Sequence, residues 1–340
     1  MKRFLALVLA VVMVMSLACV ASAADVKTYK VGCSIYTFDD NFMTLYRNEI
    51  IDYFKTLETD TVKYDITMAD GKNDMAEQTN QVQNFITQGM DVIILNLVQT
   101  SSADAIIDMV VEAGIPLVLI NREPLAYDKD GKTLDEAYEG ILDNPTVCYV
   151  GADARQSGTY QGELILETET QGDINGDGKI TYIMCKGDPE NIDAQYRTEY
   201  SIKALTDEGK EVECLYEYLD NWDQTTAQQD VANALSQYGD KIEVVFCNND
   251  AMALGALQSI QQAGRTVGKD IYLVGVDALA EAVQDVLDGN MTGTVLNDDV
   301  GQATAAAEAT KLYVEGSAVE QYYWVDYVKV TKDNASQYVK

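Results

Sequence analysis

Polar side chains follow the apolar runs of this sequence at the points where those runs end. They are carboxylates, neutral amides and one guanidinium, and they recur after six runs. A hydroxyl-rich ligand requires such a set, because each hydroxyl both donates and accepts a hydrogen bond. A single Asp or Asn at such a place is more often a helix N-cap, so only the recurrence favours a binding site. The candidates are Tyr36, Asp40, Asn96, Asp193, Arg197, Asn248, Asn249, Asp250, Asp277 and Asn297.

Two aromatic residues stand near these polar positions. Phe42 follows the first apolar run, and Trp222 lies among polar residues in the segment 219–223. A tryptophan at such a position is more often half-buried packing than a platform for a ligand. A pyranose, however, has apolar C–H faces and a polar rim, so two aromatic plates surrounded by polar groups would form a suitable pocket.

The segment 173–181 resembles the first nine positions of a calcium-binding EF-hand loop. Asp173, Asn175 and Asp177 supply oxygen side chains at loop positions one, three and five, and Gly178 stands at position six. Position twelve, which should be a bidentate Glu, is Met184. The site is therefore either incomplete or completed by a carboxylate from elsewhere, and a plain Asp/Gly turn is the alternative. A phosphate loop is excluded, because the residue after the lysine is Ile rather than Ser or Thr.

The elements that must position these residues alternate regularly from residue 30 onward. Short β-branched runs predict strands and the amphipathic stretches between them predict helices, as in βαβ units of a parallel sheet. At this length, the repetition predicts an α/β fold of two doubly wound parallel-sheet lobes, with ligands at the carboxyl ends of the strands. The predicted strands are 31–36, 62–68, 92–98, 116–120, 147–150, 180–185, 212–218, 243–247, 271–276 and 292–296.

Composition excludes several classes of function. The 340 residues include 24 basic and 55 acidic side chains and no histidine, for a formal charge of −31. Sequence-independent nucleic-acid binding requires an excess of Lys and Arg, so no nucleic-acid partner is expected. Ser-His-Asp and Cys-His catalysis and imidazole-ligated metal sites are excluded by the missing histidine.

The first 23 residues read as a secretory signal peptide. Basic residues precede the apolar run 4–17, and small residues at 21–23 fit a cleavage site. An extracytoplasmic, periplasmic location is expected, or a lipid anchor at the cell surface if Cys19 in an imperfect lipoprotein box is modified. Five further cysteines follow, an odd number without a C-x-x-C pair, and buried free thiols are favoured over a disulfide framework.

These motifs together resemble the periplasmic glucose/galactose-binding proteins of bacterial ABC sugar importers, within the type I periplasmic binding protein family. The similarity covers essentially all of residues 30–340. Its carriers are 35–43, 96–98, 150–153, the loop 173–181, 186–189, 193–198, Trp222-Asp223, 242–253, 275–279 and 293–298.

The resemblance implies a role for each matching residue. Phe42 and Trp222 correspond to the plates that sandwich the pyranose. Its hydrogen-bonding rim corresponds to Asp40, Asn96, Asp193, Arg197, Asn249, Asp277 and Asn297, with Tyr36 at the edge. The carboxylate matching Asp40 accepts a hydrogen bond from either C4 epimer. Asn191 stands where the family has a histidine that contacts the sugar. An amide is shorter and does not titrate near neutrality, which affects the ranking of hexoses.

For calcium, the family recruits its last carboxylate from the sheet, at the position of Glu243. Lys179 would contribute its backbone carbonyl, and Thr181 stands where the family presents a longer amide. The implied cofactor is a structural Ca²⁺ ion held by Asp173, Asn175, Asp177, Lys179, Thr181 and Glu243. Its place on one lobe predicts that it stabilises the loop without touching the sugar.

The resemblance also implies an organisation and partners. The N-terminal lobe would comprise 25–122 plus 298–326 and the C-terminal lobe 123–297 plus 327–340, joined by a three-segment hinge near Arg122, Asp298 and Tyr327. A monomer is expected to capture a monosaccharide, D-glucose or D-galactose, and deliver it to an ABC transporter permease; a chemoreceptor is a further candidate partner. The segment 125–144 replaces a shorter family connection, and within it 128–132 is interpreted as a solvated loop.

Three other interpretations stay open. Another monosaccharide, such as ribose or xylose, could be the ligand. A repressor's ligand-binding domain shares the fold, but the export signal and the absence of a basic helix-turn-helix before residue 30 count against it. A glycosidase could use Asp40, Asp193 and Asp277 as acid and base. Carboxylates fixed by an arginine and amides are better suited to binding than to proton transfer, so a non-enzyme is predicted.

Overall fold

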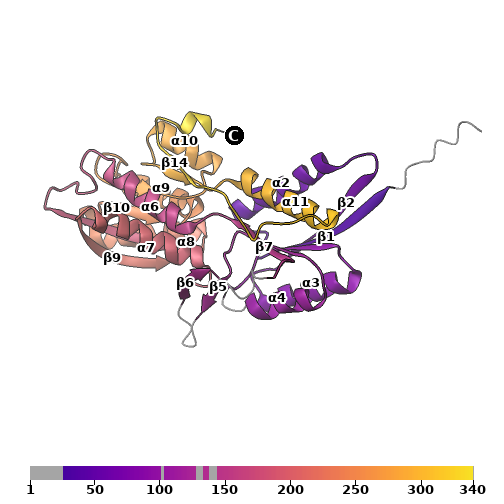
Figure 1. Cartoon of the computed structure of the whole chain (residues 1–340). Coiled ribbons are helices and arrows are strands. Elements are labelled where there is room, and N and C mark those ends of the chain that lie inside the picture. The colour runs from indigo at the N-terminus through magenta and orange to yellow at the C-terminus, as the bar shows by residue number, and fades with distance from the viewer. Residues whose placement is uncertain (1–25, 101–102, 128–132, 138–143, 340) are drawn as a thin grey trace, which may run out of the picture.

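The computed structural model describes residues 26–100, 103–127, 133–137 and 144–339. The predicted signal peptide, with Cys19, lies outside these residues. The described part forms two α/β lobes joined by three crossings of the chain (Figure 1). This arrangement confirms the predicted fold class.

The first lobe contains six parallel strands in the order β13-β7-β4-β3-β1-β2. Helices α2 and α11 cover one face of this sheet, and α3 and α4 cover the other (Figure 1). The elements are β1 (Lys27–Ile35), α2 (Asn41–Leu57), β2 (Val62–Asp70), α3 (Met75–Gln88), β3 (Val92–Leu95), α4 (Ala103–Glu112), β4 (Leu117–Ile120), β7 (Val147–Gly151), α11 (Asp299–Glu315) and β13 (Tyr322–Trp324).

Strand β3 explains why these strands read as continuous apolar runs. Val92 and Ile94 pack against the core under α2 and α11, whereas Ile93 and Leu95 pack on the opposite side. All four side chains are fully buried. Because helices cover both faces of the sheet, side chains on either face of a central strand are buried, and every residue of the strand is apolar.

The second lobe contains four parallel strands in the order β11-β10-β8-β9 and a separate antiparallel pair, β12 with β14. Helices α6 and α7 pack on one face, and α8, α9 and α10 share the core on the other. The elements are α6 (Ala154–Leu166), β8 (Lys179–Lys186), α7 (Ile192–Asp207), β9 (Glu211–Leu219), α8 (Gln224–Tyr238), η1 (Gly239–Lys241), β10 (Val244–Cys247), α9 (Asp250–Gln262), β11 (Tyr272–Val274), α10 (Ala280–Asp288), β12 (Thr294–Leu296), β14 (Val328–Val330) and η2 (Ala335–Gln337).

The first crossing lies further along the chain than the sequence predicts. Strand β7 was expected to open the second lobe, but its buried residues 147–150 pair with β4 in the first sheet. The first crossing therefore follows β7 near residue 152 rather than lying at Arg122. The other two crossings lie between β12 and α11 and between β13 and β14.

The segment that precedes β7 explains why the first crossing follows β7 rather than lying at Arg122. Strands β5 (Leu125–Tyr127) and β6 (Thr133–Ala137) form an antiparallel pair within the segment 125–144, for which the sequence suggested only a longer connection. The expected loop at 128–132 lies outside the described residues. This hairpin occupies the connection between β4 and β7, where a helix would otherwise signal continuation of the same sheet.

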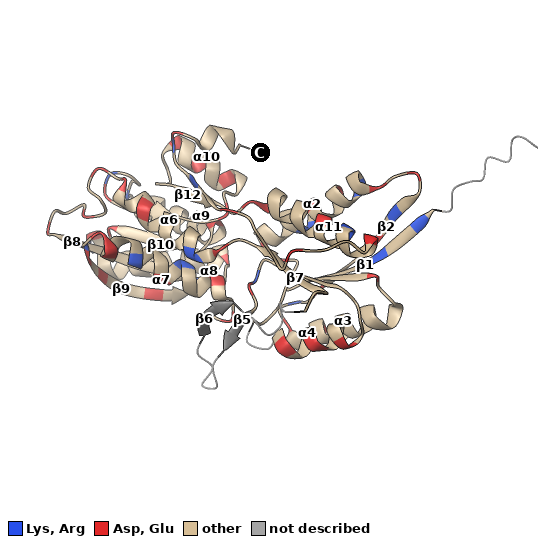
Figure 2. Ribbon diagram, in the orientation of Figure 1, with Lys and Arg blue, Asp and Glu red and all other residues tan. Residues whose placement is uncertain are grey.

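Acidic side chains are spread over both lobes (Figure 2), and most of the cysteines are buried. Acidic residues occur along the helices and loops of both lobes (Figure 2). The five cysteines of the described part are free, and all but Cys214 are buried. No helix in the described ranges is both long and apolar enough to cross a membrane.

Candidate functional site

A cavity lies between the two lobes and collects most of the predicted site residues. Its empty volume is about 320 Å³, including space open to solvent. Ten of the eleven predicted ligand-binding residues line it; Asn96 does not. The lining residues are Tyr36, Asp40, Phe42, Met43 and Asn121 from the first lobe, Asn191, Asp193, Arg197, Trp222, Asn249 and Asp277 from the second, and Asn297 at a crossing.

Three of these residues cap helices and line the cavity at the same time. Asp40 Oδ1 accepts a hydrogen bond from the backbone N–H of Met43 at the start of α2 (2.6 Å). Asn191 and Asn249 cap α7 and α9 in the same way. The sequence presented capping and ligand binding as alternatives, but each cap uses one oxygen and leaves the second polar atom of the side chain for other partners.

The wall from the first lobe is built on Tyr36 and Asp40. The Tyr36 hydroxyl donates to Asp40 Oδ2 (2.7 Å), and the Arg122 guanidinium lies over the Tyr36 ring at 3.8 Å from its centroid. Burial, and secondarily the Asp40 carboxylate, raise the pKa of the Tyr36 hydroxyl well above its usual value. Tyr36 is therefore a neutral donor that holds the Asp40 carboxylate in place.

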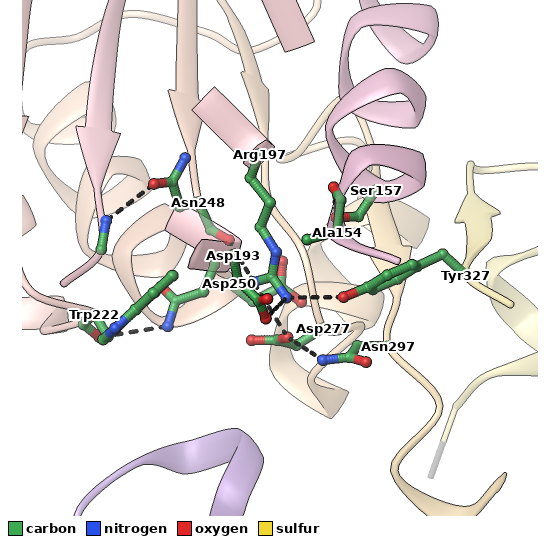
Figure 3. A network of polar contacts seen from close by, with 12 residues as sticks. Ala154, Ser157, Asp193, Arg197, Trp222, Asn248, Asp250, Asp277, Asn297 and Tyr327 are labelled. Atoms are coloured by element: carbon green, nitrogen blue, oxygen red, sulfur yellow. Dashed lines mark hydrogen bonds and ion pairs between the residues drawn. The ribbon is translucent and has the colours of Figure 1, made fainter. Parts of the chain in front are cut away.

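Arg197 organises the wall from the second lobe (Figure 3). Its Nη2 donates to Asp193 Oδ2 (3.4 Å) and to the Tyr327 hydroxyl (3.1 Å). Its Nη1 donates to the backbone carbonyl of Asn248 (2.8 Å) and lies 3.9 Å from Asp277 Oδ1. Burial raises the pKa of both carboxyl groups, and the arginine charge opposes that shift. One guanidinium thus orients two buried carboxylates.

Asn297 continues this network at the crossing between the lobes. Its Nδ2 donates to Asp277 Oδ1 (3.3 Å), and its Oδ1 accepts from Gln302 Nε2 (2.6 Å) at the start of α11. Gln302 is fully buried in the first lobe. A side chain of the cavity is thereby fixed by residues from both lobes.

The position of the Trp222 side chain depends on an unusual backbone conformation at residues 221 and 222. Asn221 and Trp222 have φ angles of 51° and 68°, in the left-handed region that side chains rarely adopt. The indole lies against Gly187, where an added Cβ would come within 2.2 Å of ring atoms. The glycine is therefore required for the indole to occupy its place at the cavity. Trp222 Nε1 is buried and has no hydrogen-bond partner among the described residues.

Asn96 acts behind the cavity rather than in it. Its Oδ1 accepts from the backbone N–H of Tyr36 (3.2 Å), and its Nδ2 donates to Asn121 Oδ1 (3.1 Å) and to the carbonyl of Ile120 (3.2 Å). Asn121, which does line the cavity, follows β4 directly and has a φ of 61°. The rule that selected the other candidates, a polar residue at a strand end, would also have selected Asn121.

Glu243 is hydrogen-bonded to the loop 173–181, which contains the other predicted calcium ligands. Both carboxylate oxygens of Glu243 accept hydrogen bonds from this segment: Oε1 from the N–H groups of Ile174 and Asn175, and Oε2 from the N–H and hydroxyl of Thr181. Asp173 accepts three backbone N–H bonds, and Asp177 accepts one from Lys179. The described residues contain no cluster of three or more carboxylate, thiol or imidazole groups positioned to hold a metal ion.

Comparison with known proteins places this geometry in a family. A model of the periplasmic binding protein domain matches residues 31–318. A D-galactose/methyl-galactoside binding periplasmic protein of Haemophilus influenzae is 36% identical over 94% of this chain and 95% of its own length. A protein of Rhizobium meliloti for which rhizopine binding is proposed is 34% identical over 99% of each chain. A Bacillus halodurans ABC transporter solute-binding protein, solved with myo-inositol, has a TM-score of 0.75 at 27% identity, covering 94% of this chain and 99% of that one.

Proposed function

We propose, because the chain belongs to the periplasmic binding protein family, that it is the sugar-binding component of an ABC importer and that its ligand is a hexose, D-glucose or D-galactose. The observation that carries the proposal is the cavity itself: one aromatic ring from each lobe, Phe42 and Trp222, with carboxylates, amides and one guanidinium around them. This set matches a ring with apolar faces and a rim of hydroxyls that both donate and accept.

Binding and closure are coupled in this proposal. The lobes already touch outside the cavity, where the Thr100 hydroxyl donates to the Glu190 carbonyl (3.2 Å) and Arg122 Nη2 lies 3.6 Å from Asp188 Oδ2. A ligand that contacts both walls stabilises this closed arrangement over an open one by its differential affinity. The permease of the importer would recognise the closed form, and a chemoreceptor is a second candidate partner.

The carboxylates of the cavity would bind rather than catalyse. Arg197 and Asn297 fix Asp277, and Tyr36 fixes Asp40, so neither carboxyl group is arranged as a mobile acid or base. The cheapest test is incubation with chromogenic galactosides and glucosides at micromolar protein. We expect no release of the chromophore, and turnover above the spontaneous rate would overturn the binding-only function.

The choice of a hexose is tested by calorimetric titration of the mature protein with glucose, galactose, ribose, xylose and myo-inositol. We expect glucose or galactose to bind tightest. Myo-inositol serves as the informative competitor, because the ligand contact of Asn191 differs from the histidine of the resembled family and a cyclitol lacks a ring oxygen. Tighter binding of a pentose or of myo-inositol than of either hexose would overturn the hexose assignment.

We also propose that loop 173–181 with Glu243 binds a structural Ca²⁺ ion. The residue types suit a hard cation, because Asp173, Asp177 and Glu243 would supply carboxylate oxygens and Lys179 its backbone carbonyl. The oxygens that would hold the ion also accept the N–H bonds of the loop, so the ion would reinforce an already ordered turn. Calcium should raise the melting temperature relative to EGTA, and the Asp173→Asn variant should lose this increment while binding sugar normally.

The remaining proposals concern location and assembly. We propose that the mature protein is an extracytoplasmic monomer, periplasmic or anchored by a lipid on Cys19. Metabolic labelling with a fatty-acid analogue separates the two cases, since only an anchored protein acquires the label and loses it in a Cys19→Ser variant. Size-exclusion chromatography with light scattering tests the monomer.

A further inference from the structure

A second cavity opens beside the sugar cavity and is not needed to hold a single hexose. Its empty volume is about 800 Å³, including space open to solvent. The two cavities share Tyr36, Asp40 and Trp222 as lining residues. They therefore adjoin, with the Trp222 indole and the Asp40 carboxylate at their common boundary.

The walls of this outer cavity come from both lobes. Thr37, Asp39 and Asn41 contribute from the segment between β1 and α2, and Asn221, Gln224 and Thr225 contribute from the start of α8. These side chains are hydroxyls, amides and a carboxylate, which is the chemistry that binds hydroxyl groups. Most of them are exposed to solvent, so a molecule that extends out of the sugar cavity meets polar groups rather than a closed wall.

The outer cavity is also negatively charged. Asp39, Asp40 and Asp223 line it, and none of its described lining residues is a lysine or an arginine. An anionic group entering it would meet like charges without a compensating cation. The wall therefore discriminates against phosphorylated or carboxylated substituents and admits neutral ones.

We propose that the outer cavity is a subsite for a neutral glycosyl substituent attached to the sugar held in the inner cavity, so that the protein accepts disaccharides as well as free hexoses. The inference rests on the proposed function, since the outer cavity adds affinity only to a ligand anchored between Phe42 and Trp222. In this proposal the substituent passes from the inner to the outer cavity beside the shared residues Tyr36, Asp40 and Trp222.

The test measures affinities for galactose, for melibiose and lactose, which carry galactose in α and β linkage, and for their anionic open-chain derivatives melibionate and lactobionate. Melibiitol and lactitol, which are open-chain but neutral, are the controls for ring opening. At least one disaccharide should bind within tenfold of galactose, and its anionic counterpart should bind at least threefold more weakly at low ionic strength. If both disaccharides bind more than 100-fold more weakly than galactose, the subsite is overturned. If an anionic counterpart binds as well as the disaccharide, the charge discrimination is overturned.

A blocking variant separates the subsite from the inner cavity. Thr225 is exposed on α8 and lines only the outer cavity, so Thr225→Trp should fill it. We expect disaccharide affinity to fall at least tenfold and galactose affinity to change less than twofold. The matched control is Gln229→Trp, also exposed and one turn further along α8 but outside both cavities, which should change neither.

The outcomes distinguish failure of the outer subsite from failure of the proposed function. Normal galactose binding with unchanged disaccharide affinity in Thr225→Trp would overturn the outer subsite alone. Failure of every monosaccharide and disaccharide to bind would overturn the proposed function and the subsite with it.

Discussion

The cavity between the lobes and the loop 173–181 with Glu243 both contain several carboxylates, yet the two regions satisfy them in different ways. In the cavity, Asp193 and Asp277 are buried and are oriented by the guanidinium of Arg197. In the loop, the exposed Asp177 and its neighbours accept hydrogen bonds from the loop's own backbone N–H groups. The loop is held by its own backbone N–H groups together with Glu243, whereas the buried carboxylates of the cavity depend on the charge of Arg197.

The two regions also differ in whether their polar groups have hydrogen-bond partners. The cavity region contains buried donors without partners among the described residues, namely Trp222 Nε1 and Arg197 Nε. A buried polar group without a partner costs about 1–3 kcal/mol, so the cavity is built at a cost to stability. The carboxylates of the loop already have donors. This contrast indicates that substitutions in the cavity change ligand binding strongly, and that substitutions in the loop change stability slightly.

The largest effect is expected from removing the guanidinium of the cavity. Arg197→Met leaves Asp193 and Asp277 buried without their cation, which should lower the free energy of unfolding by about 3–5 kcal/mol at pH 7 and abolish sugar binding. Urea unfolding and calorimetry measure the two effects. Arg265→Met is the control, because its partner Asp270 is half exposed and its loss should cost far less. Equal losses in both variants would contradict the special role of the cavity.

A pH-dependent stability is expected from Asp220, which is fully buried two residues before Trp222. Burial, and secondarily the neighbouring Asp230, raise its pKa to about 7. The folded protein therefore keeps the proton that the unfolded chain loses near pH 4, so stability falls as pH rises from about 4 to about 7 and is then constant. Asp220→Asn should remove about 2–3 kcal/mol of the decrease between pH 5 and pH 8.

An Asp→Asn exchange in the loop 173–181 is the control for the Asp220→Asn prediction. Asp177→Asn makes the same exchange at an exposed position, so an effect shared by both variants reports the exchange itself rather than the burial of Asp220. Denaturant titrations at pH 5, 6, 7 and 8 on all three proteins give the comparison. A wild-type profile that Asp220→Asn does not flatten would mean that the buried carboxyl group ionises freely.

Most of the cavity could be predicted from sequence because its residues obey one rule of parallel sheets. Asp40, Asn249 and Asp277 follow strands, and the carboxyl ends of parallel strands meet at one edge. The rule does not say which of two neighbouring amides faces the ligand. Asn96 and Asn121 both follow strands, and only the backbone conformation of Asn121, with a φ of 61°, distinguishes them.

The boundary of the first lobe could not be predicted for a related reason. Strand β7 is apolar like every central strand, so its sequence does not reveal which of two sheets it joins. Membership is decided by pairing with β4 across the hairpin of β5 and β6. Local pattern predicts the type of an element, whereas the choice of partner depends on contacts between distant residues.

A smaller effect is expected from removing the indole of Trp222. Trp222→Ala should lower sugar affinity by about tenfold to thirtyfold, about 1.4–2 kcal/mol, because the ring loses its stacking surface. Trp324→Ala is the control, because Trp324 is 46% exposed on the edge strand β13 and does not line the cavity. Calorimetry should detect no change in affinity for that variant. A Trp222→Ala protein that binds sugar normally would remove the indole from the proposed site.

The smallest effect is expected in the loop, and it tests the independence of the two regions. Asp177→Ala removes one exposed carboxylate that accepts a hydrogen bond from the Lys179 backbone, which should cost about 0.5–1 kcal/mol of stability in calcium-free buffer. Sugar affinity should stay within twofold of the wild type, because the cavity's network reaches the loop through no shared side chain. A tenfold loss of sugar affinity would show that the loop sets the position of the second lobe's sheet, and the two regions would then form one energetic unit.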